Sequence, residues 1–396
     1  MAKDKIVLAF SGGLDTSVAV PWLKEKYDAD IITLTMDLGM VDLESIKSRA
    51  MQVGAAKALT VDAKEALVNE FLFPGLQAGA IYEGVYPLAT ALGRPLIARC
   101  LVEAAKAEGA FAVAHGCTGK GNDQVRIDVG VVALAPEIKV IAPIREWGMS
   151  REDEVDYARE RNIPINASKS RFSVDENLWG RSAEAGELED PWAEPPEEAY
   201  EWTKPVNETP NDPTYLEIHF EQGIPTAIDG ESMGGTALIN HLNTVAGING
   251  VGRIDHVENR LVGIKSREIY EAPAAVVLHA AHQALEAMTL SKDQARTKAR
   301  IAQEYADMVY NGLWFTAHRL DLSAYIQSTQ RYVTGDIRVR LHKGTCTVVG
   351  RTSPTTLYQH QLATYDRGDQ FDHSAAEGFI TIYGLPVRTQ NQTQRE

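Results

Sequence analysis

At 396 residues and 43.4 kDa, the chain is too long for one ordinary hydrophobic core, so we expect two domains. Its 54 acidic and 39 basic residues leave a net charge of −15, which argues against nucleic acid as the main partner, because phosphate backbones bind basic surfaces. No apolar run approaches the roughly 18 residues that span a membrane, so no membrane partner is expected.

The three cysteines, Cys100, Cys117 and Cys346, are widely spaced and form no CxxC pair. This spacing is typical of a reducing compartment and gives no sign of a zinc site. The first residues, MAKDKIVLAF, contain too short an apolar run for a signal peptide. We therefore expect a cytoplasmic protein.

Strand and helix patterns alternate over the first 165 residues. The clearest helix begins at Pro95 and ends at Gly109. Strands buried on both faces are predicted by four nearly continuous apolar runs, at 5–10, 30–36, 110–116 and 138–144. This alternation predicts an α/β fold with a doubly wound parallel sheet, in which ligands bind at the carboxyl ends of the strands.

The second half of the chain has a different pattern. The acid- and proline-rich stretch 184–213 predicts a long surface loop that wraps another part of the molecule, because Trp192, Tyr200 and Trp202 are too many aromatic residues for a free linker. A second, mixed α+β domain is predicted by the elements that follow, which are strands at 215–220, 253–259 and 260–265, helices at 273–289 and 291–311, and a hairpin around Lys343-Gly344.

The stretch AFSGGLDTS, residues 9–17, follows the first strand. Glycines at a strand-to-helix turn let backbone N–H groups converge on an anion, and the hydroxyls of Ser11, Thr16 and Ser17 can add donors. Asp15 could hold a magnesium ion. SGG alone fits a tight turn with a helix cap equally well, but the whole string predicts a phosphate cradle. Pro21 is tolerated best in a first helical turn, which predicts a helix that starts near Thr16.

This stretch resembles the pyrophosphate-binding loop of the ATP pyrophosphatases, the PP-loop superfamily. Within that group the chain, from residue 5 to about residue 385, resembles the argininosuccinate synthase family. The resemblance rests on four further stretches in the expected order: HGCTGKGNDQVR (115–126), SVDENLWGRS (173–182), GVGRIDHVENR (250–260) and KSREIYEAP (265–273). It implies a carbon–nitrogen ligase of arginine biosynthesis, which condenses citrulline with aspartate through a citrulline-adenylate, using ATP with Mg²⁺ and releasing AMP and pyrophosphate.

The resemblance also implies an architecture. The nucleotide-binding domain, similar to the adenine nucleotide alpha hydrolases, would cover 1–168, and a synthetase and multimerisation domain would cover 169–360. A C-terminal oligomerisation arm would cover 361–396, in a homotetramer.

The resemblance assigns substrates to individual residues. Aspartate would be held by Thr118, Asn122 and Asp123. ATP would lie against Ala9, Phe10, Ser11, Gly12, Gly13, Leu14, Asp15, Thr16, Ser17 and Gly116. Citrulline would be held by Tyr86, Asn122, Arg126, Ser173, Ser182, Glu258 and Tyr270. These residue types suit the substrates, because a guanidinium such as that of Arg126 grips a carboxylate with two hydrogen bonds, whereas Arg126 outside its motif reads as a surface ion pair. Glu258 can pair with a substrate ammonium. No catalytic acid or base is assigned, and no tightly bound metal is expected.

Three residues depart from the family pattern: Phe10 replaces a common tyrosine, Met40 a frequent glutamine, and Ala91 a serine that contacts citrulline in many members.

Outside the motifs, His279, His282 and Glu286 share one helix face, as a metal site requires. We interpret these histidines as core or interface residues, because the helix is otherwise apolar.

Other functions remain open at this stage. A PP-loop enzyme that modifies tRNA would be basic and usually carries paired cysteines, and a glutamine-dependent ligase would need an amidotransferase nucleophile. A non-catalytic adenine-nucleotide sensor would have no reason to keep GKGNDQVR. Pyrophosphate release with citrulline and aspartate would separate these functions.

Overall fold

The computed structural model describes residues 3–39, 42–164 and 171–394. One compact unit ends at Thr355 and a second begins at Thr356. Met40 and the predicted domain boundary at 168/169 lie outside the described residues, so the domain limits drawn from the sequence stay a prediction.

Five parallel strands form the first sheet, in the order β3-β2-β1-β4-β5. They are β1 (Lys5–Ala9), β2 (Asp30–Asp37), β3 (Lys57–Asp62), β4 (Ala112–Ala114) and β5 (Lys139–Ile141). Consecutive side chains Ile6, Val7 and Leu8 of the central strand are fully buried, because helices cover both faces. The predicted doubly wound parallel sheet is confirmed. The sequence prediction missed β3, an edge strand whose partly exposed residues form no continuous apolar run.

The helices of this part are α1 (Leu14–Tyr27), α2 (Leu43–Gln52), α3 (Lys64–Leu67), α4 (Phe73–Ala78), α5 (Ala89–Glu108), α6 (Asp123–Leu134), α7 (Pro143–Trp147) and α8 (Arg151–Glu160). The first helix begins at Leu14, close to the predicted Thr16, but the predicted place of two prolines is wrong. Pro21 lies inside α1 and Pro95 inside α5, rather than in a first turn. A proline inside a helix removes one backbone hydrogen bond. Both helices are rich in buried residues, so their packing compensates for this loss.

A four-stranded antiparallel sheet has the order β11-β12-β7-β6. Its strands are β6 (Ser173–Asn177), β7 (Gly180–Glu184), β11 (Arg253–Asn259) and β12 (Lys265–Glu271). The predicted strand at 260–265 is wrong, since residues 260–264 form the turn between β11 and β12, and Lys265 is the first residue of β12. Helix α5 packs against both β1 and β7, and so joins this sheet to the parallel one.

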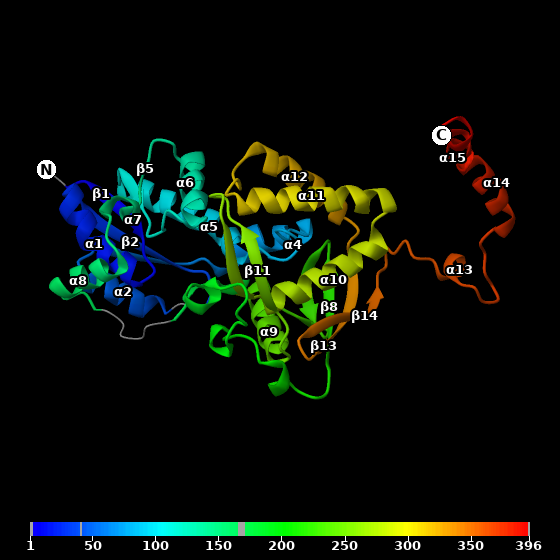
Figure 1. Ribbon diagram of the computed structural model, residues 1–396, viewed down its shortest axis with the longest axis horizontal. Coiled ribbons are helices and arrows are strands. Elements are labelled where there is room, and N and C mark those ends of the chain that lie inside the picture. The colour runs from blue at the N-terminus through cyan, green and yellow to red at the C-terminus, as the bar shows by residue number, and fades with distance from the viewer. Residues whose placement is uncertain (1–2, 40–41, 165–170, 395–396) are drawn as a thin grey trace. The chain divides into compact units, whose positions relative to one another are not determined.

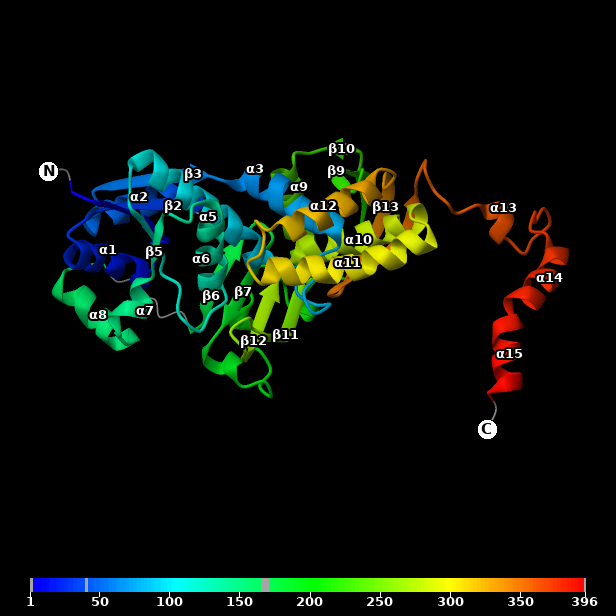
Figure 2. The ribbon, with the colours of Figure 1, turned by 90° about the horizontal axis from the view of Figure 1, so that it is seen from above.

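A second antiparallel sheet has the order β10-β9-β8-β13-β14. Its strands are β8 (Thr214–Glu221), β9 (Ile224–Ile228), β10 (Glu231–Ser232), β13 (Gly335–His342) and β14 (Thr345–Thr352), and the accompanying helices are α9 (Gly235–Ile248), α10 (Pro273–Thr289), α11 (Lys292–Tyr310) and α12 (Ala317–Gln330). The predicted hairpin is confirmed, and its turn residues Lys343 and Gly344 both have positive φ. Within the first unit, which ends at Thr355, the parallel sheet with α1 and α8 lies at one end, and α10 with β8 and β13 lies at the other (Figure 1 and Figure 2).

The predicted surface loop joins β7 to β8 and contains three short 3₁₀ turns, η2 (Gly186–Glu189), η3 (Glu197–Ala199) and η4 (Val206–Glu208). The buried carboxylate of Glu271 accepts hydrogen bonds from the backbone N–H groups of Trp202 and Thr203, each at 2.9 Å. These hydrogen bonds confirm that the loop wraps another part of the molecule, the four-stranded sheet that contains Glu271. Trp192 takes no part in it, because its side chain is 95% exposed.

The histidines of α10 lie among core residues, as predicted. The ring of His279 packs edge-on against Trp179, with centroids 6.1 Å apart. His282 is 2% exposed and pairs with the Oε1 atom of Gln330 at 2.9 Å.

The second unit contains the helices α13 (His360–Ala363), α14 (His373–Tyr383) and α15 (Leu385–Thr393). Large apolar side chains of α14, such as Phe379 and Tyr383, are 63% and 75% exposed. Among the described residues of both units, no helix combines the length and apolarity needed to cross a bilayer.

Candidate active site

The glycine-rich stretch forms the turn between β1 and α1. Gly12 has a φ of +79°, a conformation that favours glycine, and Gly13 is the N-cap of α1. The carbonyl of Gly13 accepts hydrogen bonds from the backbone N–H of Ser17 at 3.0 Å and from its hydroxyl at 2.7 Å. The turn therefore directs the first N–H groups of a helix out of the sheet, which is the arrangement of an anion-binding loop.

A cavity of about 370 Å³ opens at this turn. Its walls include Ser11 and Thr16 after β1, and His115 and Gly116 after β4. The two glycine-rich stretches therefore share one cleft, as the sequence predicts, at the point where the strand order reverses. A Cβ atom on Gly116 would lie 2.9 Å from the Cγ2 atom of Thr16, so only glycine lets the two loops approach this closely.

Part of the cavity wall is apolar. It is formed by Met36, Leu38, Ile97 and Ile127. A cavity whose wall carries both hydrogen-bond donors and apolar side chains suits a nucleotide, because its phosphates and its purine need these two environments.

Asp15, in the first turn of α1, lies beside two groups of α8. Its carboxylate contacts the guanidinium of Arg151, and it also interacts with Glu154. Burial, followed by the charge of Asp15, raises the pKa of the Glu154 carboxyl to about 7. Glu154 therefore keeps its proton to a higher pH than an ordinary glutamate does.

A smaller cavity of about 80 Å³ lies beside the first, and Asp175 lines both. It collects every predicted amino-acid-binding residue except Thr118 and Ser173, which line neither cavity as described and are exposed. The residues gathered from the prediction are Tyr86, Asn122, Asp123, Arg126, Ser182, Glu258 and Tyr270. Five elements or loops, distant in sequence, thus meet at one point.

Glu258 of β11 is 3% exposed and is held by two tyrosines. Its Oε2 atom accepts a hydrogen bond from Tyr270 and its Oε1 atom one from Tyr310, both at 2.6 Å. Tyr86 stacks on Tyr270 with ring centroids 4.2 Å apart. A buried carboxylate with oriented lone pairs is suited to binding an ammonium group.

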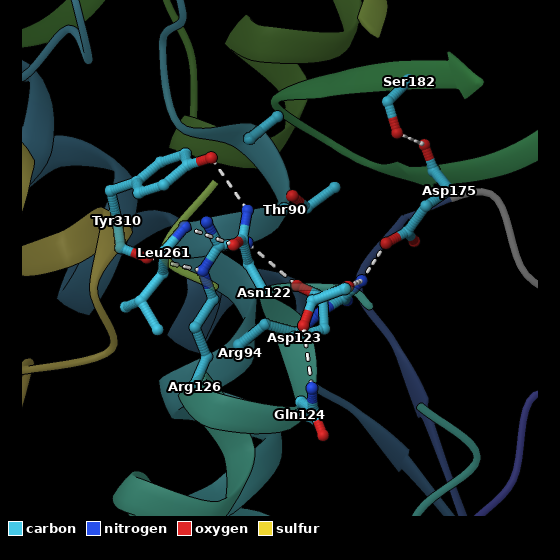
Figure 3. A network of polar contacts seen from close by, with 12 residues as sticks. Thr90, Arg94, Asn122, Asp123, Gln124, Arg126, Asp175, Ser182, Leu261 and Tyr310 are labelled. Atoms are coloured by element: carbon cyan, nitrogen blue, oxygen red, sulfur yellow. Dashed lines mark hydrogen bonds and ion pairs between the residues drawn. The ribbon is translucent and has the colours of Figure 1, made fainter. Parts of the chain in front are cut away.

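Asp123 lies between two arginines (Figure 3). Its Oδ1 atom accepts a hydrogen bond from Arg126 at 2.9 Å and its Oδ2 atom one from Arg94 at 2.7 Å. Burial alone would raise the pKa of this carboxyl, but the two guanidinium charges outweigh it and hold the pKa well below its usual range. The Nη2 atom of Arg126 is buried without a hydrogen-bond partner in the described structure, so it can donate to a carboxylate of a ligand.

Sequence reasoning missed several residues of this site, namely Thr90, Arg94, Asp175 and Tyr310. Arg94 could have been found as the one charged residue among the first turns of an apolar helix. Ala91 is fully buried, and the adjacent Thr90 lines the smaller cavity, where its hydroxyl lies 2.8 Å from that of Tyr86.

Two family models match the chain. The arginosuccinate synthase N-terminal HUP domain matches residues 5–164, and the arginosuccinate synthase C-terminal domain matches residues 172–390. The chain belongs to the argininosuccinate synthase family. The similarity extends over the whole length of curated relatives, so it covers both cavities and the elements that form them.

Three argininosuccinate synthases illustrate this similarity. The protein of Dehalococcoides mccartyi strain BAV1 is 58% identical, over 99% of this chain and 97% of its own. That of Gloeobacter violaceus is 57% identical over all of both chains, and that of Symbiobacterium thermophilum is 56% identical over 100% and 99%. Among solved structures, an NH3-dependent NAD synthetase from Campylobacter jejuni is 14% identical, over 41% of this chain and 66% of its own. Its TM-score of 0.28 is too low to carry an argument.

Proposed function

We propose that the protein ligates citrulline and aspartate to argininosuccinate, with ATP cleaved to AMP and pyrophosphate through a citrulline-adenylate. The observation that carries the proposal is the junction of the two cavities, one with a phosphate loop and the other with paired cationic and anionic side chains. A nucleotide and two zwitterionic amino acids need these groups side by side. Family membership supports the same reaction.

The larger cavity binds ATP. The β and γ phosphates bind the turn at 11–17, and the base lies against the apolar wall near Met36 and Ile127. Gly116 closes the opposite side of the nucleotide.

The smaller cavity binds the amino acids. The unpartnered Nη2 atom of Arg126 binds the citrulline carboxylate, and Glu258 binds its ammonium group. Aspartate binds at Asn122 and Asp123, with Thr118 on the adjoining loop. Asp123 is already paired with two arginines. It therefore has two roles in aspartate binding, to hold these cations in place and to contact the substrate.

Magnesium accompanies ATP as part of the substrate complex. Asp15 fits this ion, because Mg²⁺ in nucleotide sites is bound by one or two carboxylates together with the phosphates. The ion supplies neutralisation of phosphate charge.

The order of the chemistry follows from citrulline itself. Its ureido carbon is a poor electrophile, because two nitrogens donate electrons into it and its oxygen is a poor leaving group. Transfer of AMP to that oxygen turns it into a good leaving group, which the aspartate amine then displaces. The protein holds the reacting groups in place and stabilises charge, and none of the named residues is assigned as the base that deprotonates the amine.

Assembly and location belong to the same proposal. We infer a homotetramer, which the exposed apolar face of α14 supports, and a cytoplasmic location, which three free cysteines support.

Pyrophosphate release tests this proposed function. We expect it with ATP, citrulline and aspartate together, with argininosuccinate formed in equal amount, and no sustained release when either amino acid is omitted. Turnover with another acceptor instead of citrulline would indicate a different PP-loop ligase. ATP binding without any turnover would indicate a nucleotide sensor.

A further inference from the structure

Arg94 is the one arginine or lysine among the described residues that line the larger cavity. It lies on α5, one helical turn after Thr90, and its side chain is 12% exposed. The cavity is proposed to take a nucleotide with several negative charges, so a lone guanidinium in its wall is placed to meet one of the phosphates.

The contacts of Arg94 with Asp123 and Asp175, shown in Figure 3, locate it at the junction of the two cavities. Its Nη2 atom donates to Asp123 at 2.7 Å and contacts the carboxylate of Asp175. Both of these carboxylates also line the smaller cavity. The Nε atom of Arg94 is buried and has no hydrogen-bond partner in the described structure.

These contacts differ from those of a purely structural ion pair. Asp123 has a second cation, Arg126, and the Asp175 side chain is 40% exposed, so each carboxylate has another source of charge compensation besides Arg94. A buried donor without a partner is costly unless a ligand satisfies it. The Nη2 atom thus fixes the guanidinium in place, and the Nε atom remains as a donor for a bound ligand.

We propose that Arg94 is a catalytic residue of the adenylation step, and that its guanidinium binds the α-phosphate of ATP. This inference rests on the proposed function. With the β and γ phosphates on the loop at 11–17, the α-phosphorus must face the smaller cavity, because the citrulline oxygen attacks from there. Arg94 lies at that boundary.

In this step the ureido oxygen forms a bond to the α-phosphorus, and the bond from that phosphorus to the bridging oxygen of pyrophosphate breaks. Pyrophosphate leaves with the electron pair, and the ureido group becomes a cationic isouronium that keeps its nitrogen-bound protons. Arg94 neither gives nor takes a proton. It stabilises the charge on the non-bridging oxygens, which is greatest in the transition state.

The test is a single-turnover experiment with enzyme in excess over labelled ATP, with citrulline present and aspartate absent. Pyrophosphate formed before an acid quench reports the adenylation rate. We expect Arg94→Ala to slow this step by about 100-fold or more, while the Kd of ATP changes by less than about tenfold, since the loop still binds the other phosphates. Added guanidinium ion should restore part of the rate, which a structural role would not predict.

Arg99→Ala is the matched control. Arg99 lies on the same helix and pairs with Glu70, but it lines neither cavity among the described residues. We expect wild-type adenylation in this variant. Arg94→Lys serves if Arg94→Ala does not fold, and it should lose at least about tenfold, because an ammonium cannot reproduce the planar fork.

An adenylation rate within threefold of wild type in folded Arg94→Ala, or in Arg94→Lys if only that variant folds, would overturn the inference. Failure of the proposed function looks different, since wild-type protein would then cleave no ATP in response to citrulline.

Discussion

The side-chain amide of Asn122 donates a hydrogen bond to the hydroxyl of Tyr310, 2.8 Å away and 188 positions later in the chain. The same hydroxyl donates to Glu258, and the backbone carbonyl of Tyr310 accepts a hydrogen bond from Arg126 at 2.8 Å. One fully buried tyrosine at the end of α11 thus holds three residues of the amino-acid cavity. We therefore expect Tyr310 to position the residues proposed to bind both amino-acid substrates.

Tyr310→Phe should raise the KM values of citrulline and aspartate and leave that of ATP unchanged. The change removes one donor to a carboxylate and one acceptor, so we expect kcat/KM for the amino acids to fall by about 10- to 100-fold. Steady-state kinetics with each substrate varied in turn measure this.

Tyr305→Phe is its control, because Tyr305 is buried on the same helix and lines neither cavity in the described part of the chain. Equal KM changes for all three substrates would show that Tyr310 acts only through stability.

Gly13→Ala tests the phosphate loop without backbone strain. Gly13 has a φ of −70°, and a Cβ atom there would meet only the Ser11 hydroxyl, at 3.4 Å, while facing the cavity that Gly13 lines. We expect the KM of ATP to rise about tenfold or more, with an unchanged melting temperature, because backbone approach to the phosphates is blocked. Gly12 is a less specific probe, since its φ of +79° strains any other residue.

Gly234→Ala provides the comparison for Gly13→Ala. Gly234 is also a helix N-cap with a φ of −64°, and a Cβ atom there would meet nothing within 4 Å. Its kinetics should match wild type. An unaltered ATP KM in Gly13→Ala would contradict a close approach of phosphate to this turn.

The parallel sheet could be predicted from sequence because its strands are buried on both faces and therefore continuously apolar. The places of Pro21 and Pro95 in their helices were predicted wrongly. The local preference of proline for a first helical turn was overridden by the burial of the whole helix. The mistaken strand at 260–265 has apolar residues, yet Leu261 lies in a turn where its N–H binds the Asn122 side chain at 2.9 Å. Such long-range contacts leave no local pattern.

The site divides in the same way. Asn122, Asp123 and Arg126 lie in one motif, so their grouping could be predicted from sequence alone. Tyr310 is the last residue of an ordinary amphipathic helix, and Arg94 lies in no motif that the sequence analysis used. Their roles become visible only when the fold brings β11, α5 and α11 together.

The Asp15–Glu154 pair predicts a pH dependence of stability. The folded pKa of Glu154, about 7, lies above its ordinary value of 4.5, so between these pH values the folded protein holds a proton that the unfolded chain has released. The contribution of Glu154 to the free energy of unfolding therefore falls as pH rises through this range.

Glu154→Gln should remove the part of the fall in the free energy of unfolding between pH 4.5 and about 7 that Glu154 causes. Urea denaturation at several pH values measures this. Glu152→Gln, on the exposed side of α8, should keep that part of the fall. Identical pH profiles for wild type and Glu154→Gln would contradict the assignment.

The exposed aromatic pair of α14 predicts a change in assembly. The rings of Phe379 and Tyr383 lie 5.2 Å apart, and a polar substitution of both removes an apolar patch that the isolated chain leaves uncovered. We expect wild type at roughly 170 kDa by light scattering and Phe379→Asp/Tyr383→Asp at a lower mass. Thr389→Asp, an exposed change on α15, should stay tetrameric, and a monomeric wild type would refute the tetramer.

The central claim is that ATP activates the ureido oxygen of citrulline. The most direct measurement follows that oxygen, by turning over citrulline labelled with ¹⁸O at the ureido group in the presence of ATP and aspartate. Mass spectrometry of the products should find the label in the phosphate of AMP, in one atom per argininosuccinate formed. Label in water or in pyrophosphate, with unlabelled AMP, would contradict the account.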